Sequence, residues 1–377
     1  MIEIERSHIL IADNFNVENW DMDDRVEEIV NLAESANSEV SGITFQKLKK
    51  PVRTYLGSGK LSETKKQIIK DKADLIIVDD ELSPNQQRYL EDLFKIKVVD
   101  RTALILDIFA NRAKSREGRL QVSLAQLEYL LPRLAGQWSH LERLGGGIGT
   151  RGPGETQIET DRRLVRTNIK KIKKDLKKIK ISRNAQRSRR LKRAFNVSLV
   201  GYTNAGKSTL FNSLSKKNSI SSGKLFSTLD TKTSKIYLDN GIGCTISDTV
   251  GFLNKLPTVL VDSFKATLEE LNDSDLLLHV IDSSNKNFEK QIEVVDNLLE
   301  DLNLEKNNMI YVFNKIDKFT KEELEEFNRR IEYLVSVDEE AIVNISAIQN
   351  MNIDILIDKI QNHTKSGYNI NSAKVLY

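Results

Sequence analysis

Eight residues, from Gly201 to Ser208, have the types and spacing of a loop that holds phosphate groups. They follow a short apolar strand, 196–200, and precede the start of a helix. In this context the pattern G-x-x-x-x-G-K-S predicts a P-loop, whose backbone N–H groups and helix N-terminus bind phosphate oxygens. We expect the lysine to reach the β- and γ-phosphates and the serine hydroxyl to bind Mg²⁺. The predicted contact residues are Gly201, Tyr202, Thr203, Asn204, Ala205, Gly206, Lys207, Ser208 and Thr209.

An aspartate and a glycine three residues apart follow the next predicted strand. Asp248 ends the segment Thr245-Ile-Ser-Asp, and Gly251 comes after it. A carboxylate at this place can hold a water bound to magnesium, and the Gly251 N–H can sense the γ-phosphate. These two residues complete the phosphate end of the predicted site.

A motif after the buried strand 309–313 addresses the nucleotide base. It reads Asn314-Lys315-Ile-Asp317. The Asp317 carboxylate can accept two hydrogen bonds, from N1–H and from the exocyclic amine of guanine, and adenine offers neither there. We expect the stem of Lys315 to lie along the base and a backbone N–H in Ser346-Ala347 to meet guanine O6. The motif therefore selects GTP over ATP.

A threonine-rich segment, Phe226–Thr233, lies between the P-loop helix and Asp248. A switch segment at this point should offer a threonine hydroxyl to magnesium. Thr228, Thr231 and Thr233 all have the required chemistry, and composition does not choose between them.

Two residues bear on the rate of hydrolysis. Phe252 stands where many GTPases carry a glutamine that orients the attacking water. Because phenylalanine cannot do this, we predict low intrinsic turnover with strong stimulation by a partner. The side-chain oxygen of Asn204 lies beside the phosphates and can ligate a monovalent cation placed like an arginine finger. We therefore predict potassium-dependent hydrolysis.

Alternating strands and helices position these motifs. The alternation from residue 196 onward predicts a doubly wound, mostly parallel α/β sheet, and the first 110 residues predict a second α/β domain. A helix after Ser83 carries a serine cap, a proline and Gln86 for a capping box. In the first 110 residues we expect strands at 9–11, 40–45, 75–78 and 98–99 and helices at 25–36, 61–70 and 83–94.

In the segment 111–195 the spacing of the apolar residues changes. Apolar residues from Leu120 to Leu141 and from Val165 to Ile179 recur in steps of three and four. Two heptad seams predict an antiparallel helical hairpin, mildly kinked at Pro132. Its tip, Gly145–Gly154, has six glycines in ten residues. The tip is either a simple connection or a functional loop, and its length favours function.

A basic block runs from Arg162 to Arg193. It contains 16 lysines and arginines and one acid, which gives a charge of +15. Because the whole chain has a net charge of +3, the rest of the chain carries −12. Such blocks often meet nucleic acid, because each neutralised phosphate releases counterions. The other interpretation is a solvated helix face.

The composition fits a soluble, cytoplasmic protein, which we expect to be a monomer. Hydrophobic residues make up 39% of 377 residues, enough for two or three ordinary cores. One cysteine, Cys244, excludes an internal disulfide, and we expect it in a core. No run reaches the ~18 apolar residues of a membrane span, and the start, Met1–Arg6, mixes acids into a pattern that a signal peptide keeps basic and apolar. The four histidines lack ligand spacing, so we predict no structural metal.

A second glycine-lysine stretch, Gly57-Ser-Gly-Lys60, lacks the full P-loop spacing. It is either a second nucleotide site or, as we favour, a turn before the helix at Leu61.

With these residues in view, the chain resembles the HflX family of translation-factor-type GTPases over nearly its whole length. The family pattern F-A-T-L-D-P-T-T-R is similar to Phe226–Ser234, which nominates Thr228 for magnesium and places Phe226, Ser227, Leu229 and Asp230 at the nucleotide. The chain departs from it at Thr231, Lys232 and Ser234. Long segments outside the GTPase motifs share the likeness: Tyr55–Lys60, Asp79–Arg88, Val99–Ala110, Leu120–Leu127 and Gly145–Arg163.

The resemblance implies a factor that binds the large ribosomal subunit and dissociates stalled or idle ribosomes under control of GTP. In that picture the tip enters the peptidyl-transferase region and the basic helix contacts ribosomal RNA. The alternatives are a ribosome-assembly or RNA-binding GTPase switch and a regulatory GTPase that binds another protein. The predicted domains are 1–110, 111–195 and 196–365, with a tail at 366–377. The predicted ribosome contacts are Gly145, Gly146, Gly147, Arg151, Gly152, Gly154, Lys170, Lys173, Lys174 and Lys177.

Overall fold

The structure is a computed structural model in which the chain forms two compact units. The first comprises Met1–Ile179 and Pro257–Ser263, and the second comprises Lys180–Leu256 and Phe264–Tyr377. The described residues are 5–14, 22–137, 153–190, 195–215, 225–226, 228–238, 243–260, 263–264, 269–302, 304, 308–334 and 341–373.

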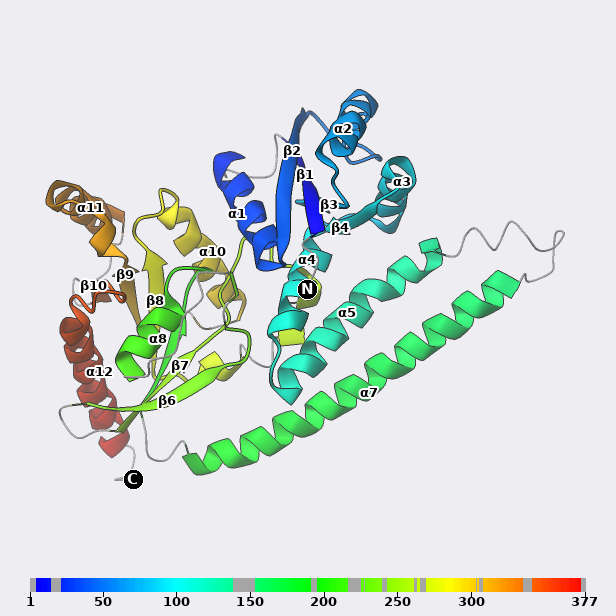
Figure 1. The fold of residues 1–377 in the computed structure, drawn as a ribbon. Coiled ribbons are helices and arrows are strands. Elements are labelled where there is room, and N and C mark those ends of the chain that lie inside the picture. The colour runs from blue at the N-terminus through cyan, green and yellow to red at the C-terminus, as the bar shows by residue number, and fades with distance from the viewer. Residues whose placement is uncertain are drawn as a thin grey trace. The chain divides into compact units, whose positions relative to one another are not determined.

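A four-stranded parallel sheet of order β2-β1-β3-β4 forms the centre of the first unit (Figure 1). The inner strand β3 is apolar and buried at every position, as expected of a parallel sheet that is covered on both faces. The predicted strands and helices of this segment are confirmed, and a helix that was not predicted, α4, follows the last strand. The elements are β1 (Glu5–Asn14), α1 (Met22–Ser35), β2 (Ser38–Leu48), α2 (Ser58–Asp71), β3 (Leu75–Val78), α3 (Pro84–Phe94), β4 (Lys97–Asp100) and α4 (Arg101–Arg112).

Local polar contacts set where two of these helices begin. Ser83 and Gln86 form the predicted capping box of α3. At α2, the Gly57 N–H donates to Oε1 of Gln46 at 2.8 Å and the helix starts at Ser58. Ser58–Lys60 is thus the first turn of α2 rather than a turn before it, which corrects the predicted helix start at Leu61.

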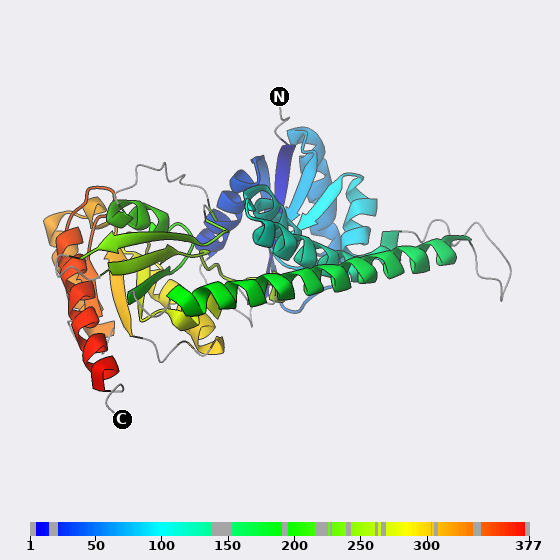
Figure 2. The same ribbon diagram turned by 90° about the horizontal axis from the view of Figure 1, so that it is seen from below.

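Two long helices form the predicted hairpin, α5 (Arg116–Gln137) and α7 (Pro153–Arg190), which run side by side (Figures 1 and 2). Lys173 Nζ lies 2.7 Å from Oε1 of Glu128 across them. Helix α5 continues through Pro132. The predicted seam positions of α7, which are Val165, Ile169, Ile172, Leu176 and Ile179, are each partly shielded, whereas the lysines beside them are exposed.

The predicted extent of the glycine-rich tip needs correction at its end. Pro153 and Gly154 are the first residues of α7. A proline suits this position because a helix leaves its first N–H groups unbonded in any case. The remaining tip residues lie outside the described part of the chain, among them Gly145, Gly146, Gly147, Arg151 and Gly152.

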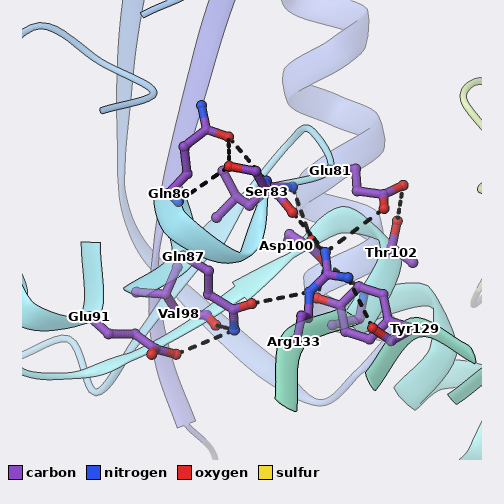
Figure 3. A network of polar contacts seen from close by, with 12 residues as sticks. Glu81, Ser83, Gln86, Gln87, Glu91, Val98, Asp100, Thr102, Tyr129 and Arg133 are labelled. Carbon is purple, nitrogen blue, oxygen red and sulfur yellow. Dashed lines mark hydrogen bonds and ion pairs between the residues drawn. The ribbon is translucent and has the colours of Figure 1, made fainter. Parts of the chain in front are cut away.

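Arg133 joins α5 to the sheet of the first unit (Figure 3). Its guanidinium donates to Leu82 O at 2.7 Å and to Oδ2 of Asp100 at 3.1 Å, and it lies 3.5 Å from the ring centroid of Tyr129. The Tyr129 hydroxyl donates to Oδ1 of Asp100 at 2.9 Å, and the same oxygen accepts the Ala103 N–H at 2.8 Å. One carboxylate at the end of β4 therefore holds both α4 and α5.

A six-stranded sheet of order β10-β9-β8-β5-β7-β6 forms the second unit, parallel except for β6. Its order reverses at β5, with β7 on one side and β8 on the other, and ligands bind such sheets at the carboxyl ends of the strands at this point. The elements are β5 (Phe195–Val200), α8 (Lys207–Ser215), β6 (Lys232–Tyr237), β7 (Gly243–Asp248), η1 (Glu269–Asp273), β8 (Leu276–Asp282), α10 (Phe288–Asp301), β9 (Met309–Asn314), η2 (Ile316–Lys318), α11 (Lys321–Leu334), β10 (Ile342–Asn344) and α12 (Ile353–Ala373).

Of two predictions for this unit, one is confirmed and one is wrong in part. Cys244 lies in the core on β7, as predicted, and burial raises the pKa of its thiol to about 12. The predicted tail at 366–377 is wrong in part, because α12 continues to Ala373. None of the described helices is long and apolar enough to cross a membrane.

Replacing Arg133 with methionine is expected to loosen α5 from the sheet. The buried carboxylate of Asp100 would lose its cationic partner, and breaking such a pair costs about 3–5 kcal/mol. Hydrogen exchange at the amides of α4 and α5 should accelerate roughly a hundredfold or more, with β8 and β9 unchanged. Arg119→Met, at an exposed position of the same helix, is the control. Equal protection of α5 in the two variants would contradict this role of Arg133.

Candidate functional site

The phosphate loop between β5 and α8 requires glycine at two positions. Gly201 has φ 143°, and a Cβ there would lie 2.2 Å from Val280 O. Gly206 has φ 97°, and its Cβ would lie 2.2 Å from Nδ2 of Asn314. Asn204 also adopts a left-handed φ of 62°, which asparagine tolerates, and its side chain is exposed. The loop can thus wrap closely around a ligand only with this pattern of residues.

Lys207, the first residue of α8, presents a buried amine inside this loop. Its Nζ donates to Gly201 O at 2.8 Å and to Tyr202 O at 2.7 Å. Burial lowers the pKa of the amine to about 8, against the opposing attraction of Asp248. A cation held at the centre of the loop is suited to phosphate oxygens.

Three oxygen-bearing side chains meet beside α8. Oδ2 of Asp248 accepts the Ser208 hydroxyl at 2.8 Å and the Thr228 hydroxyl at 2.7 Å, and the two hydroxyl oxygens lie 2.9 Å apart. Oδ1 of Asp248 is buried and has no hydrogen-bond partner in the described part of the chain. Oxygen ligands of this kind suit Mg²⁺. P-loop GTPases generally use that ion, so the residues fit the expected group.

The residues of the switch segment differ in whether they contact this cluster of oxygens. Thr228 is the threonine that reaches it, whereas Thr233 contacts Ser247 at 3.3 Å and is exposed. The side chains of Phe226 and Leu229 are buried, Asp230 is partly exposed, and Ser227 lies outside the described residues.

The predicted base-binding motifs converge at the other end of the loop. Asn314 Nδ2 donates to Ala205 O at 2.9 Å, and its Oδ1 accepts the Ala347 N–H at 2.9 Å. The Ser346 hydroxyl donates to Oδ1 of Asp317 at 2.6 Å, which orients the carboxylate that should read guanine. Asn314 therefore joins the loops, and the guanine-reading role of Asp317 stays a prediction.

Asp282 is a residue of the site that the sequence interpretation missed. Its Oδ2 lies 2.5 Å from Lys315 Nζ, and its Oδ1 accepts the Ser284 hydroxyl at 2.6 Å. Lys315 has a left-handed φ of 71°, and the ion pair fixes its side chain beside the predicted base position. The available signal was a polar residue at the carboxyl end of the apolar strand β8.

Gly251 lies against the phosphate loop, as predicted. A Cβ at this position would lie 2.9 Å from Lys207 Nζ and 3.0 Å from Thr203 Cα. Phe252 after it is only 2% exposed. Its side chain therefore packs in the interior and offers nothing to a water at the phosphates.

Proton uptake on GDP binding should reveal the lowered pKa of Lys207. Below pH ~8 the amine is charged with or without ligand. Above it the free amine is neutral, and the bound phosphate favours the charged form, so binding should take up as much as one proton and weaken as pH rises. Calorimetry at about pH 9 and 6.5, in buffers of different ionisation enthalpy, measures this. Lys207→Arg stays charged and should show no uptake, and no uptake by the unchanged protein at pH ~9 would refute the assignment.

Three segments of the chain match known families of GTP-binding proteins. Residues 23–110 match the GTP-binding GTPase N-terminal family, residues 112–190 the GTP-binding GTPase middle region, and residues 196–315 a family described as 50S ribosome-binding GTPase. The crystal structure of SsGBP in complex with GDP is similar with a TM-score of 0.52 and 26% identity, over 96% of this chain and 99% of that one.

Curated relatives share close to half of their aligned residues with this chain. GTPase HflX of Alkalihalophilus pseudofirmus is 48% identical over 314 residues, covering 83% of this chain and 74% of the relative. GTPase HflX of Escherichia coli K12 is 44% identical over 314 residues, covering 83% and 72%. With the phosphate loop and the guanine-reading motif in place, the chain is a GTP-hydrolysing P-loop protein and belongs to the HflX family of GTPases.

Proposed function

We propose that this GTPase binds the large ribosomal subunit in the cytoplasm and uses GTP to dissociate or rescue stalled or idle ribosomes. The observation that carries the proposal is the exposed basic face of α7. Lys170, Lys174 and Lys177 are exposed, and Lys173 is exposed although it also pairs with Glu128. A charge of +15 between Arg162 and Arg193 suits a phosphate backbone.

Two further points support a ribosomal partner. The family matched by residues 196–315 is described as a 50S ribosome-binding GTPase. Helix α7 continues directly from the glycine-rich tip, so the hairpin that bears the basic face also presents the tip, which we propose as the part that enters the peptidyl-transferase region.

We assign the GTP site as follows. Lys207 neutralises the β- and γ-phosphates, and the Gly251 N–H contacts the γ-phosphate. The hydroxyls of Ser208 and Thr228, with Asp248 through a water, would hold Mg²⁺, and the ion would supply charge neutralisation at the phosphates.

The base end holds guanine. Asp317 accepts its N1–H and amine protons, Ala347 donates its N–H to O6, and the stem of Lys315 covers the ring. Ser346 fixes the acceptor geometry of Asp317, because its hydroxyl donates to one of the two carboxylate oxygens.

Reversing three charges on α7 should abolish ribosome binding. Lys170→Glu, Lys174→Glu and Lys177→Glu together remove phosphate contacts and add repulsion, so co-sedimentation with large subunits should fall at least tenfold and lose much of its salt dependence. The matched control is Lys65→Glu, Lys66→Glu and Lys70→Glu on the exposed face of α2. Equal binding by both triple variants would contradict the RNA-contacting role.

Light scattering separates dissociation from assembly and from protein regulation. With GTP, the unchanged protein should lower the scattering of intact ribosomes. Binding to large subunits without such a loss would favour an assembly or RNA-binding switch. No binding at all would leave a regulatory GTPase with a protein target.

Turnover should be slow without a partner and depend on potassium. Phe252 is buried and cannot orient water, whereas Asn204 offers an exposed amide oxygen beside the phosphates. Steady-state phosphate release should be faster in potassium than in sodium, rise strongly with large subunits, and lose its cation preference in Asn204→Ala. Equal rates in the two salts, or fast release by the protein alone, would count against these assignments.

A further inference from the structure

A short segment after β7 is bonded to the phosphate loop at three points. The Thr203 N–H donates to Phe252 O at 2.7 Å, and the Phe252 N–H donates to Gly201 O at 3.1 Å. The Asn254 N–H donates to the Tyr202 hydroxyl at 2.8 Å. A parallel β-bridge thus pairs Tyr202 with Phe252, and the segment lies along the loop like a short added strand.

This pairing fills the space beside the Lys207 amine. The backbone of Gly251 packs so closely that a Cβ would lie 2.9 Å from Nζ. In the described part of the chain, Lys207 directs hydrogen bonds at two carbonyls, Gly201 O and Tyr202 O, which leaves one of its three N–H groups for phosphate.

A triphosphate requires more room beside Lys207 than a diphosphate does. One N–H of Lys207 suffices for the β-phosphate. A γ-phosphate that is to lie between Lys207 and the Gly251 N–H must move Gly251 away from the amine. The bonded segment is therefore a resting state that accepts GDP more readily than GTP.

Tyr202 supplies the side-chain part of the pairing. Its ring is buried, with 5% of the residue exposed, and its hydroxyl accepts the Asn254 N–H. The other two bonds join backbone atoms, which side-chain substitution does not remove. A phenylalanine would fill the same space without this acceptor, so the bond to Asn254 is removed while the buried ring is kept.

We propose that Tyr202 is a specificity-determining residue, whose hydroxyl stabilises the resting position of residues 251–254 and so weakens GTP binding relative to GDP. The inference rests on the contact of the Gly251 N–H with the γ-phosphate proposed above, and the hydroxyl acts through residues 251–254. One such hydrogen bond shifts an equilibrium by roughly threefold to tenfold.

Tyr202→Phe tests the proposal in the full chain. We expect the affinity for a non-hydrolysable GTP analogue, measured with Mg²⁺, to rise about threefold to tenfold, and that for GDP to stay within about twofold. Tyr55→Phe is the control, because Tyr55 is also buried and its hydroxyl accepts the Ala12 N–H at 3.1 Å, besides donating to Oδ2 of Asp80 at 2.8 Å. It should leave the ratio of the two affinities unchanged.

A ratio that stays constant or falls in Tyr202→Phe overturns the proposal, as does an equal loss of both nucleotides. A second measurement needs no variant. In the unchanged protein, exchange of the Asn254 amide should be faster with the GTP analogue than with GDP, because the bond to Tyr202 is released. Equal protection in the two complexes also overturns the proposal.

Discussion

The side chain of Asn314 ties the phosphate end of the nucleotide site to its base end. It donates to Ala205 O and accepts the Ala347 N–H, each at 2.9 Å, although these residues are 109 and 33 positions away in the chain. An amide can do both because it carries a donor and an acceptor, which a carboxylate does not. The close approach also requires Gly206 to lack a Cβ. Three loops therefore depend on one amide for their spacing.

Both sheets gather polar groups at the carboxyl ends of parallel strands, but the two edges differ. In the first unit Asp79 follows β3 and is bonded to Arg25 at 2.7 Å and to Arg101 at 2.8 Å, so its charge is neutralised within the fold. In the second unit Asp248 ends β7 and keeps one buried oxygen without a described partner. The carboxylate at the first edge is thus neutralised by the chain itself, whereas the carboxylate at the second edge keeps an oxygen that is available to a ligand.

Features that depend on residues close together in the chain could be predicted from the sequence. The loop Gly201–Ser208 and the capping box of α3 are each defined within eight residues, and the heptad seam of α7 follows from helix geometry. The pairs Asp282–Lys315 and Arg133–Asp100 join residues 33 positions apart. They depend on strand register and helix packing, which one sequence does not encode locally. That Phe252 does not orient water stays a prediction, whereas its backbone pairing with the phosphate loop had no sequence signal.

The second compact unit is not one continuous stretch of chain, since Pro257–Ser263 belongs to the first. A fragment cut at residue 180 would carry this heptapeptide away from the unit to which it belongs. Leu260 and Ser263 in this segment are 1% and 6% exposed in the whole chain, so a fragment must keep their side chains covered. Grafting this GTPase unit onto another protein would therefore require redesign of residues 257–263. The two units are therefore poor candidates for separate exchange between genes, in evolution as in engineering.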